Sequence, residues 1–158
     1  TARVMYGASA GSVDNAQRLR LRSEAPLTDP ATLSREARQD FQRAITEGKG
    51  FQPEALAGLG LLYKEKAEGF GGSGEFEDEQ ANYTEAAKYL QRSVKQISGA
   101  PDAVVIYQLL GLVYERLQKY QDAIAVYEEF LRIFPDSAES TAIRSFIVQL
   151  KKQSTNDR

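Results

Sequence analysis

Apolar residues recur every three or four positions along most of the chain, which is the spacing of one face of an α-helix. The run Val104-Val105-Ile106 is β-branched, but Pro101 precedes it and helical spacing continues to Leu117, so helix is favoured over strand there. No segment gives a convincing strand pattern. The fold class expected is therefore all-α, with helices at about 30–48, 53–68, 80–98, 101–117, 120–134 and 137–152.

Several residues mark the expected helix ends. Asp29 and Pro30 suit the N-cap and the first helical position. Pro135 stops the fifth helix, because proline has no N–H to donate. Ser137 is the expected N-cap of the last helix, which runs into two lysines.

The chain repeats itself. Leu59-Gly60-Leu61-Leu62-Tyr63 is echoed by Leu110-Gly111-Leu112-Val113-Tyr114. The second copy extends to a longer pattern made of Tyr107, Leu110, Gly111, Tyr114, Ala123, Tyr127 and Pro135. Small residues at Gly111 and Ala123 let two antiparallel helices approach, while the larger residues interlock around them.

This pattern resembles the tetratricopeptide repeat (TPR), which reads W-x2-L-G-x2-Y, A-x3-F, P over about 34 residues. Tyr107 stands in for the Trp and Tyr127 for the Phe. The resemblance implies antiparallel helix pairs stacked into a solenoid, a right-handed superhelix.

The first copy is longer than the second. Gly60 and Gly111 lie 51 residues apart, and Tyr63 to Ala86 spans 23 positions where Tyr114 to Ala123 spans 9, which leaves 14 extra residues. Added loop length costs little, so we expect a loop insertion at 68–82 between the two helices of this repeat.

The expected organisation is a single TPR domain, 1–158. Residues 1–29 are either an N-terminal helix with a linker or a degenerate repeat helix. The other segments are helix B of an earlier repeat (30–50), a TPR with the insertion (53–98), a second TPR (104–137), a capping helix (138–152) and a disordered tail (153–158).

Composition narrows the chemistry. The chain has no Cys and no His, so the usual zinc ligands, thiols, disulfides and imidazole bases are missing. We therefore expect that the protein binds no metal, needs no cofactor and is not an enzyme. A net charge of −2 argues against nucleic-acid binding, which depends on Lys and Arg at phosphates. The longest apolar stretch, Ala103–Tyr114, is too short for a transmembrane segment.

The compartment stays open between the cytoplasm and a bacterial periplasm or envelope. The start at Thr1 also leaves open whether a leader, a lipid anchor or a further domain lies upstream.

Three polar segments invite a functional reading. The glycine-rich run Gly69–Gly74 lacks the Gly-Lys-Ser/Thr of a phosphate loop, so a spacer is preferred. The acidic run Glu75–Glu79 lacks the ligand alternation of an EF-hand, so a solvated acidic loop is preferred over docking to a basic partner. The basic stripe Arg18–Arg22 is interpreted as a surface helix or linker.

The TPR resemblance also implies a site, because TPR proteins bind peptides on a concave face lined by the first helix of each repeat. Matching positions give what we call the predicted binding face: Leu61, Lys64, Glu65, Val105, Gln108, Leu112, Glu115, Arg116 and Phe146. The polar clamp with which some TPR proteins grip chaperone C-termini is absent, since Ala57, Leu61, Gln108 and Leu112 occupy its positions. The face has an apolar floor instead, which suits an amphipathic helix or an apolar extended segment.

The leading hypothesis is a non-catalytic adaptor that binds a partner protein or peptide within a larger assembly. One alternative is the helical appendage of a larger enzyme. Another is a bacterial envelope or secretion assembly factor, since Tyr127–Leu131 and Phe134–Ser137 are similar to repeats of envelope lipoproteins. A homodimer through an exposed solenoid end is a further expectation.

Overall fold

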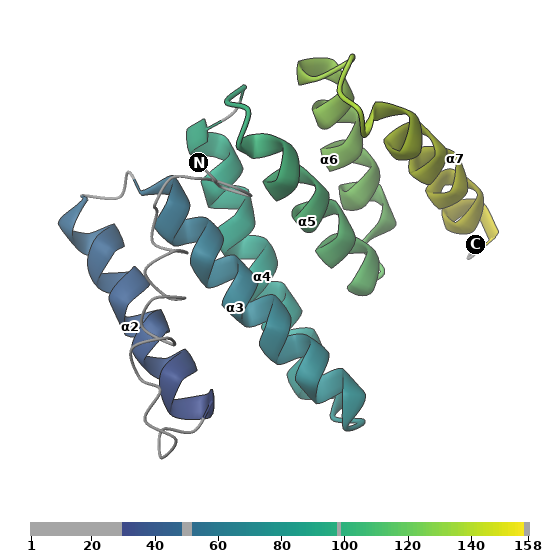
Figure 1. Ribbon diagram of the computed structural model, residues 1–158. Helices are drawn as coiled ribbons and strands as arrows, with labels where there is room; N and C mark the ends of the chain where they lie inside the picture. The colour runs from purple at the N-terminus through teal and green to yellow at the C-terminus, as the bar shows by residue number, and fades with distance from the viewer. Residues whose placement is uncertain (1–29, 49–51, 98, 157–158) are drawn as a thin grey trace.

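Six helices make up the computed structural model (Figure 1), which describes residues 30–48, 52–97 and 99–156. Within these residues there is no strand. The helices are α2 (Pro30–Glu47), α3 (Pro53–Gly72), α4 (Phe76–Ile97), α5 (Ala103–Arg116), α6 (Tyr120–Ile133) and α7 (Ser140–Asn156). The all-α prediction is confirmed, and all six expected helices are present.

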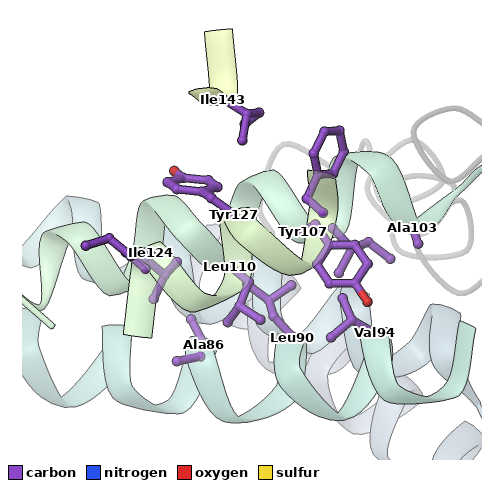
Figure 2. Packing of buried hydrophobic residues seen from close by; sticks show 14 of the residues in the cluster. Ala86, Leu90, Val94, Ala103, Tyr107, Leu110, Ile124, Tyr127 and Ile143 are labelled. Carbon is purple, nitrogen blue, oxygen red and sulfur yellow. The ribbon is translucent and has the colours of Figure 1, made fainter. Parts of the chain in front are cut away.

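Each helix packs mainly against its neighbours in the sequence, so the chain forms a solenoid of antiparallel helices (Figure 1). α3 and α4 make the most extensive contact, followed by α4 with α5 and α5 with α6. One apolar core runs from α3 through α7, and a second lies where α2 meets α3 and α4. Figure 2 shows the larger core, where Leu90 and Val94 of α4 lie beneath Tyr107 and Leu110 of α5.

The two repeat glycines lie where the two helices of a pair approach each other closely. A Cβ on Gly60 would come within 2.6 Å of Leu90 Cγ, and a Cβ on Gly111 would come within 2.2 Å of Tyr127 Cε1. Both distances are far below van der Waals contact, so a side chain at either position would displace its neighbour. The repeat signature therefore marks close helix–helix approaches, as the sequence predicts.

The loop predicted at 68–82 is wrong. α3 continues to Gly72 and α4 begins at Phe76, so the extra residues lengthen both helices and only a short turn joins them. Packing explains the difference, because Ala67 and Tyr83 are buried between the two extended ends. The turn itself needs glycine at one place, Gly74, whose φ is +81°.

The C-terminal predictions need two smaller corrections. α7 extends to Asn156, so residues 153–156 are helical where a disordered tail was predicted. The helix begins at Ser140, three residues after the predicted cap Ser137, and the Ser140 amide donates to the Ser137 carbonyl oxygen at 3.0 Å. The segment 1–29, including Asp29 and the arginine stripe, lies outside the described residues.

Candidate partner-binding surfaces

The predicted binding face is spread over three helices. α3 carries Leu61, Lys64 and Glu65, and α7 carries Phe146. The other five residues are all on α5: Val105, Gln108, Leu112, Glu115 and Arg116. Neither α3 with α5 nor α5 with α7 is among the helix pairs in extensive contact. The face is therefore built from alternate helices, each separated from the next by a helix of the other layer.

The side chains of this face differ in exposure. Glu65, Arg116 and Phe146 are exposed, and the other six are half-buried, namely Leu61, Lys64, Val105, Gln108, Leu112 and Glu115. Phe146 is 42% exposed, which is unusual for a phenylalanine in a chain with an established core. The apolar residues of the face are thus neither fully packed nor fully solvated.

Several polar groups of this face already have partners. Lys64 Nζ lies 2.9 Å from Glu68 Oε2, one helical turn further along α3. Gln108 Nε2 donates to the Val104 carbonyl oxygen at 3.3 Å. These contacts hold two of the predicted polar side chains close to their own helices.

Glu115 accepts a hydrogen bond from a buried tyrosine. The Tyr127 hydroxyl donates to Glu115 Oε2 at 2.6 Å, across the close approach at Gly111. Burial, and then the hydrogen bond and negative charge of Glu115, raise the pKa of Tyr127 well above its ordinary value, so the hydroxyl stays protonated at physiological pH. The Phe146 ring lies on the same tyrosine, with ring centroids 5.9 Å apart. Phe146, Tyr127 and Glu115 therefore form one connected cluster of α7, α6 and α5.

A hollow lies on the opposite side of α5. At about 100° per residue, Tyr107 and Leu110 point away from the side that carries Val105 and Leu112. A space of about 430 Å³ opens over Tyr107 and Leu110, between α4 and α6. The repeat pattern did not predict it, because it forms between helices of two different repeats.

A metal-binding cluster and a membrane-spanning helix are both absent from residues 30–48, 52–97 and 99–156. No group of three or more Asp and Glu residues there is placed to hold a metal ion. None of the helices α2–α7 is long and apolar enough to cross a membrane.

These observations define a class of protein, a solenoid of antiparallel helix pairs with candidate binding sites on its surfaces. Residues 65–136 match the family model of the tetratricopeptide repeat. This segment of the chain is therefore built of tetratricopeptide repeats, and such repeats generally mediate protein–protein interaction. Among curated proteins, none matches the chain.

Proposed function

We propose that this chain is a non-catalytic interaction module that binds a peptide or helical segment of a partner protein across the predicted binding face. The observation that carries the proposal is Phe146, which remains 42% exposed although its ring lies on Tyr127. An aromatic side chain held in place by a neighbour and still open to solvent is a typical anchor for a partner.

The chemistry of the face suits an amphipathic segment. Leu61, Val105 and Leu112 are half-buried apolar side chains on α3 and α5, so each can bury further area against a partner. Arg116 is exposed at the end of α5 and supplies a positive charge beside them. A partner with an apolar stripe flanked by a carboxylate would complement this arrangement.

A charge-reversal variant tests the proposal. Leu112→Asp/Arg116→Glu places carboxylates in the centre of the face, so we expect it to lose a partner that the wild-type chain captures from native lysate. Val148→Asp/Arg144→Glu is the matched control, because it makes the same kinds of change on exposed positions of α7. Circular dichroism and thermal unfolding establish that both variants are folded before the comparison.

Quantitative mass spectrometry of the captured proteins gives the answer. A partner depleted roughly tenfold from the first variant but not from the control supports the predicted binding face, since tenfold corresponds to about 1.4 kcal/mol. Equal recovery of all partners on both variants would contradict it. Phe146→Ala, at an already exposed position, should then weaken the same partner if the α7 part of the face takes part.

A further inference from the structure

Two surfaces outside the predicted binding face carry a large exposed apolar side chain. Among the described residues, the exposed side chains of this kind are Phe76, Phe146 and Val148, and Phe146 belongs to the predicted binding face. Phe76 is 67% exposed at the start of α4, and Val148 is 53% exposed on α7. Because single exposed apolar residues are common on protein surfaces, the charges around these two decide whether they form a contact.

The outer side of α7 presents Val148 between two cations. Arg144, Val148 and Lys152 are four residues apart, so they lie in one row along the helix that spans about 12 Å. All three side chains are exposed, whereas Ile143 and Leu150 on the other side of α7 are buried. α7 packs extensively against α6 alone, so none of the described helices covers this row (Figure 1). We call Arg144, Val148 and Lys152 the α7 row.

The surface around the α7 row is positive. A shallow depression of about 370 Å³ opens along it, and the charged residues that line this depression are Arg144 and Lys152. α7 contains no acidic residue. Within residues 30–48, 52–97 and 99–156, the ion pair of α7 is that of Lys151 with Glu128 at 3.6 Å, so neither cation of the row has a carboxylate partner. The Arg144 guanidinium donates only to the Pro135 carbonyl oxygen, at 3.3 Å.

The turn between α3 and α4 presents Phe76 among carboxylates. Glu75 precedes Phe76, Glu77 and Asp78 follow it, and all of these side chains are exposed. The first half of α4 contains no basic residue. The Glu75 carboxylate accepts a hydrogen bond from Ser73 Oγ at 2.7 Å, whereas the carboxylates of Glu77 and Asp78 have no partner among the described residues. We call residues 75–78 the acidic tip.

The acidic tip is accessible to another molecule. In Figure 1 the joined ends of α3 and α4 stand clear of the ends of α5 and α6. Carboxylates at the N-terminus of α4 also stabilise the helix dipole, but that role does not require an exposed phenylalanine among them. The position of Phe76 therefore needs an explanation beyond the stability of α4.

The two surfaces complement each other, and neither complements itself. The α7 row has a cation on each side of an apolar residue, and the acidic tip has carboxylates on both sides of an aromatic one. Two α7 rows paired antiparallel about Val148 would place Arg144 opposite Lys152, and two acidic tips would bring carboxylates together. Both symmetric arrangements are repulsive, so opposite charges meet only when a tip contacts a row.

We propose that the chain associates with itself head to tail, with the acidic tip of one copy bound to the α7 row of another. Phe76 packs on Val148 in the depression, and the flanking carboxylates pair with Arg144 and Lys152. Each copy keeps one free tip and one free row in such a heterologous contact, so successive copies form open chains. Only a few side chains are buried, so the association is weak and depends on concentration.

Analytical ultracentrifugation of the chain tests whether it associates. The weight-average mass should rise as the concentration of the chain increases from about 20 µM to about 1 mM. It should fall when the salt concentration is raised from about 50 mM to about 500 mM, because salt screens exposed charges. A mass that remains that of the monomer at the highest protein concentration would overturn the proposal.

Two variants that each remove one surface identify the contact. The tip variant is Phe76→Ser/Glu77→Gln, and the row variant is Val148→Asp/Arg144→Glu. All four positions are exposed, so both variants should fold, which circular dichroism establishes. Each variant alone should be monomeric. Their equimolar mixture should form a complex of two chains and no larger species, because one intact tip and one intact row remain to meet.

The mixture also gives the result that contradicts the proposal. If it stays monomeric while the wild type associates, the acidic tip does not bind the α7 row. Association of either variant alone to the extent of the wild type would equally overturn the assignment.

A matched pair of charge reversals separates the row from a general effect of net charge. Lys152→Glu should weaken the association about fivefold, whereas Lys95→Glu, the same change at an exposed position of α4, should leave it unaltered. Equal weakening by the two variants would show only a dependence on net charge and would refute the role of the row.

This inference and the proposed function can fail independently. Leu112→Asp/Arg116→Glu alters the predicted binding face and should associate as the wild type does. The row variant leaves that face unchanged and should still capture its partner from lysate. If self-association is lost in Leu112→Asp/Arg116→Glu and kept in the row variant, the copies meet through the predicted binding face and the α7 row is not their contact.

Discussion

The helix pair α3–α4 and the helix pair α5–α6 carry the same Leu-Gly-x2-Tyr signature but differ in length and in what covers the glycine. α3 and α4 have 20 and 22 residues, whereas α5 and α6 have 14 each. In Figure 1 the joined ends of α3 and α4 extend beyond the ends of α5 and α6. The signature thus determines how two helices meet, while helix length varies outside it.

The residue facing the glycine is the second difference. Leu90 covers Gly60 in the longer pair, and Tyr127 covers Gly111 in the shorter one. The leucine side chain has no polar atom, whereas the Tyr127 hydroxyl donates a hydrogen bond to Glu115 and the Tyr127 ring packs against Phe146. The shorter pair therefore connects its closest helix contact to the predicted binding face, and the longer pair does not.

The largest expected effect on the free energy of unfolding comes from replacing the repeat glycines, Gly111 and Gly60, by alanine. Gly111→Ala would press on an aromatic ring pinned by its hydrogen bond, so we expect a loss of about 2 kcal/mol after the gain in helix propensity. Gly60→Ala meets Leu90, a smaller side chain that no hydrogen bond holds in place, so we expect a smaller loss of about 1 kcal/mol. Urea unfolding of both variants gives the two values.

A double variant provides the control for this comparison. Tyr127→Leu makes the shorter pair resemble the longer one, so Gly111→Ala should cost at least about 1 kcal/mol less in that background. Additive effects would mean that the ring is not the source of the penalty.

Tyr127→Phe is expected to lower the free energy of unfolding by about 1 kcal/mol near neutral pH, because Glu115 loses its donor. Folding raises the pKa of this hydroxyl above its ordinary value of 10.0, so its contribution is complete below pH 10 and decreases as the pH rises further. Stability measured from pH 8 to 11 should thus fall more steeply in the wild type than in the variant. Parallel curves would contradict this account. Tyr83 and Tyr114, whose pKa values burial also raises, are common to both proteins and cancel in the comparison.

The smallest expected effect is that of Gly69→Ala in the extended end of α3. Gly69 is helical and nothing lies within 4 Å of a Cβ placed there, so Gly69→Ala should stabilise the chain by about 0.5–1 kcal/mol. Gly74→Ala is the contrasting variant, since its φ of +81° strains any other residue and should cost about 1–2 kcal/mol. Thermal unfolding distinguishes the two signs, and a destabilised Gly69→Ala would argue that this part of α3 is not helical.

The sequence predicted the helices well because their apolar spacing and the small residues at Gly60 and Gly111 are local signals. It failed at 68–82, where the glycines favour a loop locally but Ala67 and Tyr83 are both buried in one core shared by the two extended helices. The glycine content of a segment reports only its local backbone preference, whereas these two buried residues are 16 positions apart in the sequence. A helical interpretation would have required recognising that both belong to the same core.

The candidate sites also contain some features that the sequence could predict and others that it could not. The positions of Leu112 and Phe146 follow from the repeat register, so the helices that carry them could be predicted. The bond from Tyr127 to Glu115 could not, because it crosses from one helix to the next. The hollow over Tyr107 depends on the distance between α4 and α6, and its available signal in the sequence was the small side chain of Ala125.

In α2 to α7 each helix packs against the next one in the sequence, and this has a consequence for how the molecule folds and unfolds. Because the extensive contacts join segments that are adjacent along the polypeptide, little loop-closure entropy is lost before they are made, and such topologies fold in microseconds to milliseconds. Among the described helices, α7 has its extensive contact with α6 alone, so we expect that separating these two helices leaves the packing of α3 to α6 in place.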